Sequence, residues 1–141
     1  MDSNVHFITL ATDDLESVRD FYVRGLGWTA HLDVPDEIVF FQVAPGLLLA
    51  FFDSRKFGED TGRAAVSVSG LTLAHNVDSP DAVVETVTRM RAAGGSVVKE
   101  PQAGAFGGVF HALVEDPNGV LWEIAHNPSW SIGDDGTVSL G

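Results

Sequence analysis

One order of secondary-structure elements occurs twice in this sequence, and this repeat restricts the possible folds more than any other feature. In each half, patterns typical of a strand, a helix and three further strands follow one another. Aligning Phe7 with Thr72 gives an offset of 65 residues, and Ala50 falls opposite Glu123 at an offset of 73. Loops of different length can absorb this drift. The sequence therefore predicts an α+β fold of two tandem βαβββ modules.

The expected strands are short runs rich in β-branched and aromatic residues. They cover residues 5–11, 28–33, 38–43 and 47–52 in the first half, and residues 71–77, 96–99, 109–115 and 120–125 in the second. Asp13, with Glu16 three residues later, predicts the N-cap of the first helix. Ser79 followed by Pro80 predicts the start of the second helix.

These patterns divide a single domain, residues 1–141, into four parts. A first module covers about residues 4–53, a linker 54–69, a second module about 70–128 and a C-terminal tail 129–141. The linker is assigned from its charged residues and glycines. The glycine-rich segment 100–108 fits either a mobile flap beside a pocket or a plain connection between strands. In the tail, Trp130 and Ile132 need a surface to cover, on this chain or on a partner.

The composition excludes several classes of function. The chain has 20 acidic residues against 8 lysines and arginines, a formal net charge of −12, so its surface repels nucleic-acid phosphates. Without cysteine it can form no disulfide, thiolate metal site or cysteine nucleophile. Its longest apolar run, residues 47–52, is too short for a membrane helix, and its first residues are unlike a secretory signal. We expect a cytoplasmic protein that binds neither nucleic acid nor membranes.

Four segments carry a resemblance to a known superfamily. They are DLESVRDFY at 14–22, LGW at 26–28, AAGG at 92–95 and EDPNGVLWEI at 115–124. In their order and spacing these segments resemble the vicinal oxygen chelate superfamily, which includes glyoxalase I, bleomycin-resistance proteins and extradiol-type dioxygenases. The resemblance covers residues 5 to about 128. It implies that the two modules form a half-open, eight-stranded, cup-shaped sheet around a pocket, with helices outside, and that the protein is a homodimer.

The resemblance also indicates where a metal would be held. In metal-using members, the ligands lie on the first and last strand of each module and are typically His, Gln or Glu. Carried over one by one, these positions are Phe7, Ala50, Thr72 and Glu123. Of these, Glu123 alone keeps a usual ligand type, and one carboxylate does not hold a divalent ion tightly. We therefore predict no metal ligands and no cofactor.

A different register would change this prediction. A one-residue slip or bulge in two strands would turn His6 and His75 inward beside Glu123, and these three residues would form a divalent-metal site. Without the slip, strand alternation directs both histidines toward the helices.

Strand alternation also selects residues expected to line the pocket. Glu123 lies between Trp122 and Ile124, which are expected to face the helices, so its carboxylate is expected in the pocket. The side of His111 does not follow from its apolar neighbours. Phe7, Phe40, Phe52 and Phe106 are expected to form aromatic walls of the pocket. The predicted ligand-binding residues are Phe7, Ala50, Phe52, Thr72, Asn76, His111 and Glu123.

Three functions remain open at this point. The first is a metal-independent small-molecule binder with an apolar pocket that contains one acidic residue, similar to the drug-sequestering members of the superfamily. The second is a lyase, isomerase or dioxygenase, which would use either the shifted metal site or Glu123 as a metal-free general base. The third is a structural or regulatory dimer whose pocket is filled by its own side chains.

Overall fold

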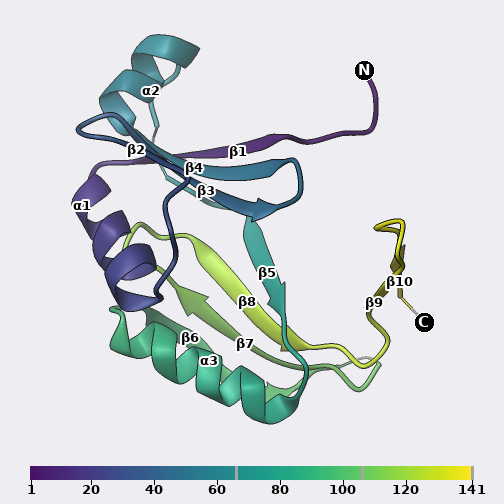
Figure 1. The fold of residues 1–141 in the computed structure, drawn as a ribbon. Helices are drawn as coiled ribbons and strands as arrows, with labels where there is room; N and C mark the ends of the chain where they lie inside the picture. The colour runs from purple at the N-terminus through teal and green to yellow at the C-terminus, as the bar shows by residue number, and fades with distance from the viewer. Residues whose placement is uncertain (66, 106, 141) are drawn as a thin grey trace. The chain divides into compact units, whose positions relative to one another are not determined.

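A computed structural model describes residues 1–65, 67–105 and 107–140. Its internal contacts divide the chain into two compact units. The first unit comprises Met1–Leu71 with Pro117–Val120, and the second comprises Thr72–Asp116 with Leu121–Gly141. Each unit contains one mixed four-stranded sheet and a helix packed on it (Figure 1). The predicted α+β fold with tandem βαβββ modules is confirmed.

The sheet of the first unit has the strand order β1-β4-β3-β2. Strand β1 is parallel to β4, and the other pairs are antiparallel. The elements are β1 (Phe7–Thr12), α1 (Leu15–Val18), the π-helical turn η1 (Arg19–Gly25), β2 (Leu32–Val34), β3 (Ile38–Ala44), β4 (Leu47–Asp53) and α2 (Ser54–Thr61).

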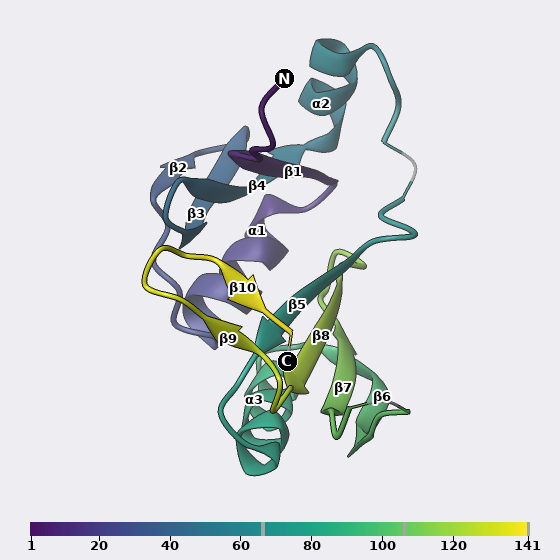
Figure 2. The ribbon, with the colours of Figure 1, turned by 90° about the vertical axis from the view of Figure 1, so that its right-hand side faces the viewer.

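The sheet of the second unit repeats this topology, with the order β5-β8-β7-β6. Again the first strand is parallel to the last and the other pairs are antiparallel. The elements are β5 (Thr72–Asn76), α3 (Pro80–Ala92), β6 (Ser96–Ala103), β7 (Phe110–Glu115), β8 (Leu121–His126), β9 (Ser131–Ile132) and β10 (Val138–Ser139). The last two form a small antiparallel hairpin in the tail (Figure 2).

The core of the first unit is aromatic. The ring of Tyr22, on η1, is fully buried and lies 5.0 Å from the rings of Trp28 and Phe51 and 5.5 Å from that of Phe41. Tilted and edge-on ring pairs at these spacings are favourable beyond their burial alone. This cluster holds η1 against one face of the sheet.

The core of the second unit is mainly aliphatic. Helix α3 buries Val83, Val87 and Met90, which recur at helical spacing, and packs on β6, β7 and β8. As predicted, Ser79 caps this helix, with its hydroxyl accepting a hydrogen bond from the Ala82 amide at 3.1 Å, and Pro80 follows it.

The first helix begins one residue later than predicted. Its N-cap is Asp14 rather than Asp13, because the Asp14 carboxylate accepts a 3.0 Å hydrogen bond from the Ser17 amide. The Thr12 hydroxyl accepts a hydrogen bond from the Asp14 amide at 3.1 Å, which keeps Asp14 outside the helix. The Asp13 carboxylate instead accepts a hydrogen bond from the Ser54 hydroxyl at the start of α2.

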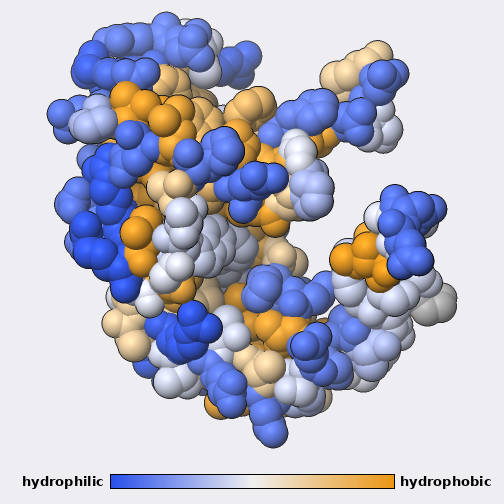
Figure 3. All heavy atoms as spheres, in the orientation of Figure 1, coloured by the Kyte–Doolittle hydropathy of each residue, from blue (hydrophilic) through white to orange (hydrophobic). Residues whose placement is uncertain are grey.

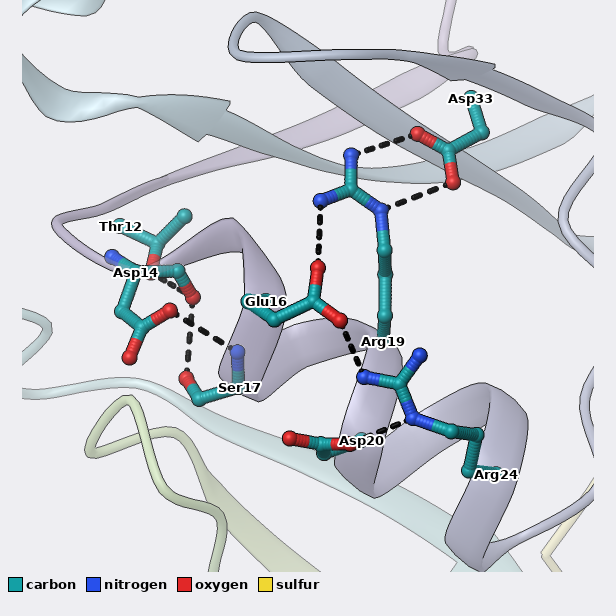
Figure 4. A network of polar contacts seen from close by, with 8 residues as sticks. All are labelled: Thr12, Asp14, Glu16, Ser17, Arg19, Asp20, Arg24 and Asp33. Carbon is teal, nitrogen blue, oxygen red and sulfur yellow. Dashed lines mark hydrogen bonds and ion pairs between the residues drawn. The ribbon is translucent and has the colours of Figure 1, made fainter.

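Charged side chains link α1 and η1 to strand β2 (Figure 4). Arg19 donates two hydrogen bonds to the carboxylate of Asp33, at 2.9 and 2.7 Å, and one to Glu16 at 3.2 Å. Arg24 pairs with Glu16 and Asp20. The hydrogen bonds from Arg19 hold the pKa of Asp33 below its usual range, and those from Asp33 raise the pKa of Arg19 further above its usual value.

Two connecting segments contain more structure than expected. The stretch assigned as a linker begins with α2, whose Phe57 ring lies 6.5 Å from that of Phe52 on β4. Strand β6 extends to Ala103, into the glycine-rich segment, and Gly104 donates a 2.7 Å hydrogen bond to the Val109 carbonyl. The described part of that segment therefore has the form of a connection between two strands.

The tail leaves apolar side chains at the surface of the β9–β10 hairpin (Figure 3). Ile132 is 64% exposed and Leu140 is 70% exposed, and Trp130, just before the hairpin, is 37% exposed.

Candidate functional site

The pairing of the strands defines the face of the second sheet on which Glu123 lies. Directly paired residues point to the same face, and Glu123 pairs with Leu113 on β7 and with Ala74 on β5. The neighbouring residues Trp122 and Ile124 are buried on the other face, where α3 packs. We call the face with the carboxylate the Glu123 face. The expected orientation of Glu123, Trp122 and Ile124 agrees with this register.

Three polar side chains from adjacent strands line up on the Glu123 face. His111, whose side could not be derived from the sequence, is one of them, because it pairs with Ala125 two residues from Glu123. Its Nδ1 atom lies 3.8 Å from a carboxylate oxygen of Glu123, and its Nε2 atom lies 2.8 Å from Nζ of Lys99 on β6. We call this set the Lys99–His111–Glu123 row. The His111 side chain is 18% exposed and that of Glu123 is 36% exposed, so a ligand can reach the row.

A β-bulge places Lys99 on this face. Val97 pairs with Val114, but the next pair joins Lys99, rather than Val98, to Leu113. In a regular strand Lys99 would lie opposite Ala112 and point toward α3, because a shift of one residue reverses every side chain. The extra residue, Val98, is 59% exposed.

Sequence reasoning did not identify Lys99, although one signal was present. Pro101 lies in a second irregularity of β6, between Lys99 and Gln102. Proline within a strand indicates an edge strand or a bulge, and β6 is an edge of its sheet. The proline could therefore have warned that simple alternation does not hold along this strand.

Strand β5 contributes further predicted residues to the Glu123 face. Thr72 pairs with Leu121, and Asn76 pairs with Ala125. His75 pairs with Ile124 and so lies on the opposite face from Glu123. The register slip that a His6–His75–Glu123 metal site requires is therefore absent from β5, and His75 is not beside Glu123. His6 lies before the first residue of β1.

The remaining predicted residues belong to the first unit and share one face of its sheet, which we call the Ala50 face. Phe7, Phe52 and Ala50 are placed there by the pairing of β1 and β4. Phe40 pairs with Ala50, and its ring lies 6.1 Å from that of Phe7. Ala50 is fully buried, whereas Phe7 is 56% exposed. Phe106, the other expected aromatic wall, lies outside the described residues.

Residues 4–124 match the family model of the glyoxalase/bleomycin resistance protein/dioxygenase superfamily. The chain belongs to this superfamily. The match covers both modules, in agreement with the resemblance found in the sequence. Comparison with curated proteins gives no match.

Solved structures of the superfamily share the fold of this chain. A glyoxalase-related enzyme from Fulvimarina pelagi is 38% identical, with a TM-score of 0.87, and the match covers 97% of each chain. A glyoxalase/bleomycin resistance protein/dioxygenase from Nocardioides is 26% identical, with a TM-score of 0.74, and the match covers 94% of this chain and 91% of that one. Lactoylglutathione lyase from Agrobacterium tumefaciens, 22% identical with a TM-score of 0.68 over 89% and 94% of the two chains, is similar in fold alone.

The superfamily positions for a chelated metal are a poor fit to such an ion in this chain. Phe7 and Ala50 offer no donor atom, and the hydroxyl of Thr72 is a weak ligand for transition metals. Glu123 faces His111, but the ring nitrogen on the far side of that imidazole is in contact with the ammonium of Lys99. No group of three potential His, Asp or Glu ligands occurs within residues 1–65, 67–105 and 107–140. No helix in those ranges is long and apolar enough to cross a membrane.

Proposed function

We propose that this protein is a metal-independent binder of a small molecule, with Glu123 anchoring a polar group of the ligand. The observation that carries the proposal is that Glu123 alone among the four chelating positions keeps a usual ligand type and that this carboxylate belongs to the Lys99–His111–Glu123 row. Phe7, Ala50 and Thr72 occupy three of the four positions at which metal-using members hold their ligands. At the fourth position, Glu123 faces His111, whose other ring nitrogen is in contact with Lys99.

The surroundings of the row support binding of a ligand with an apolar body. Leu113, Ala74 and Ala125 lie beside Glu123 and His111 on the same face of the sheet. Ligand sites typically combine such apolar lining with a few polar groups that orient the ligand.

Metal titration tests the first half of the proposal. Nickel, zinc, manganese and ferrous iron are added to the purified protein in a calorimeter, with Glu123→Ala as the matched variant. We expect no tight binding by either protein. Tight binding that disappears in Glu123→Ala would contradict metal independence.

A thermal-shift screen tests the second half, because a ligand that binds the folded state raises the melting temperature. We expect some compounds of a small-molecule library to stabilise the protein, and Glu123→Ala to lose that stabilisation. Exposed Glu85 on α3 supplies the control variant Glu85→Ala, which should respond like the natural chain. If no compound stabilises the protein, the structural or regulatory dimer is favoured instead.

A second candidate is a metal-free lyase or isomerase in which Glu123 acts as general base. It is favoured by the 38% identity to a glyoxalase-related enzyme and by the contact between Glu123 and His111. A compound found in the screen is incubated with the protein in deuterated water. Incorporation of deuterium that is lost in Glu123→Gln, while binding remains, would support catalysis. Binding without incorporation supports the binder.

A further inference from the structure

The contact between Lys99 and His111 determines where the imidazole carries its proton. A lysine ammonium has three donors and no acceptor, so Nε2 of His111 must accept the 2.8 Å hydrogen bond. The single proton of the neutral ring is then on Nδ1. This is the nitrogen that faces Glu123, at 3.8 Å from its nearer oxygen. The row therefore presents an N–H donor directly beside a carboxylate acceptor.

The distance between that donor and that acceptor leaves both available to a third group. At 3.8 Å, Nδ1 and the Glu123 oxygen are too far apart for a direct hydrogen bond, which needs about 2.7–3.2 Å. An oxygen atom placed to the side of both can accept from Nδ1–H and donate to the carboxylate. A hydroxyl does both, whereas an ether oxygen cannot donate and an ammonium cannot accept.

The charges of the row also disfavour a cationic ligand. Lys99 carries one positive charge and Glu123 one negative charge, and neutral His111 lies between them. A carboxylate alone on this face would attract a cation, but the nearby ammonium offsets that attraction. The apolar neighbours Leu113 and Ala125 suit an uncharged ligand body.

We propose that the Lys99–His111–Glu123 row is a recognition site for the hydroxyl group of a neutral small molecule, with Lys99 as the positioning residue that fixes the tautomer of His111. This inference rests on the proposed function and names its ligand class. His111 donates to the hydroxyl oxygen, Glu123 accepts from the hydroxyl proton, and Lys99 touches neither.

Nitrogen-15 spectra of the histidine rings test the role of Lys99 without any ligand. Spectra are recorded at about pH 8, where neutral imidazole predominates, and His111→Gln identifies the His111 signals. We expect the Nδ1–H form of His111 in the natural chain and the Nε2–H form, which neutral histidine prefers in water, in Lys99→Met. Lys99→Arg, which keeps a donor-only cation, should restore the Nδ1–H form.

His126 provides an internal reference in the same spectra. Its Nδ1 lies 3.2 Å from the Val77 carbonyl, which can only accept, so His126 should keep the Nδ1–H form in every variant. An Nε2–H form of His111 in the natural chain, or a tautomer that does not respond to Lys99→Met, would overturn the assignment of Lys99.

Three matched probes test the ligand class: benzyl alcohol, benzyl methyl ether and benzylammonium. Binding is followed by titration of backbone amide shifts on β7 and β8. We expect benzyl alcohol to bind more tightly than the other two. Lys99→Met should change the ratio of the dissociation constants of benzyl alcohol and benzylammonium by about tenfold in favour of benzylammonium. The reason is that the Glu123 carboxylate then lacks the positive charge that offsets its own. Arg63→Met removes a cation from an exposed site of the first unit and should leave the preference unchanged.

The outcomes separate the two proposals. If benzyl alcohol binds on the Glu123 face no better than the ether or the cation, the hydroxyl assignment is wrong and the binder remains supported. If the tautomer depends on Lys99 but no probe and no library compound binds, the binder itself is wrong and the hydroxyl assignment fails with it.

Discussion

The two sheets have the same topology, but their equivalent faces differ in chemistry. Ala50 and Glu123 take the same position on the last strands of the two modules, and two strands outward from them the pairing leads to Leu32 and Lys99. Ile38 and His111 also correspond, because each pairs with the residue two positions further along its last strand. Each polar member of the row thus has an apolar counterpart in the first unit. The backbone repeat supplies a pleated surface twice, and one surface is polar because of its side chains and of the bulge that turns Lys99 onto it. The candidate function therefore belongs to the second module.

The largest effect is expected when the acidic residue of the Glu123 face is introduced at the corresponding position of the Ala50 face. Ala50 is fully buried beside Phe40, so Ala50→Glu puts an unpaired carboxylate among apolar groups. We expect a loss of about 3 kcal/mol or more in the free energy of unfolding, measured by chemical denaturation. The control variant Ala50→Gln introduces a side chain of similar size without the charge. If Ala50→Gln lowers the free energy of unfolding as much as Ala50→Glu does, size rather than charge causes the loss.

The converse exchange gives the second module the residues of the first. The triple variant Lys99→Leu, His111→Ile, Glu123→Ala should keep a free energy of unfolding within about 1 kcal/mol of the natural chain, because whole polar sets are often replaced by apolar residues at little cost. Binding of benzyl alcohol should fall by at least about tenfold. Severe destabilisation of the triple variant would show that the row is structural.

A smaller effect is expected from the helix N-caps, Asp14 in the first module and Ser79 in the second, which should contribute similarly to the two modules. Ser79→Ala and Asp14→Ala should each lower the free energy of unfolding by about 1 kcal/mol, since each removes a side-chain acceptor from a helix N-terminus. Asp13→Ala should have a smaller effect in the same denaturation experiment. A larger effect for Asp13 would contradict the observed start of the first helix.

The smallest expected effect concerns the ion pair of Arg19 and Asp33, which joins η1 to β2 in the first module as Arg91 and Glu100 join α3 to β6 in the second. Asp33→Asn should cost about 0.5–1 kcal/mol at neutral pH, because the pair is bidentate but partly exposed. The pKa of Asp33 is lowered by Arg19 in the folded state, so this stabilisation is present above the ordinary value of 3.8 and is lost as the pH falls below it. Denaturation curves of both proteins should therefore converge in acid, and a constant difference would contradict the assigned cause.

Much of the fold could be predicted from the sequence because its signals are local. The repeat and the Ser79–Pro80 cap depend on residues close together in the chain, and the predicted strands overlap the observed ones. The start of the first helix could not be predicted reliably, because Asp13 and Asp14 are both good caps. The choice between them depends on Thr12 and on Ser54, a residue far along the chain.

The site could be predicted only in part, for a related reason. The orientation of Glu123 was predicted because Trp122 and Ile124 on either side were expected to face the helices. The side of His111 could not be predicted, because the run of apolar residues around it did not show which of them face the helices. Lys99 was missed because the bulge at Val98 depends on how β6 pairs with β7, which alternation along one strand does not show.

The bulge at Val98 also suggests how such a protein acquires new chemistry. On an edge strand such as β6, a one-residue change of register alters the pairing with a single neighbour and leaves the rest of the sheet intact. If Val98 itself paired with Leu113, Lys99 would lie opposite Ala112, and its ammonium would be withdrawn from the carboxylate and histidine without substitution of any of the three. In this architecture, a change of pairing by one residue can exchange the functional groups of a binding surface, a route to diversification that comparisons of substitutions alone would overlook.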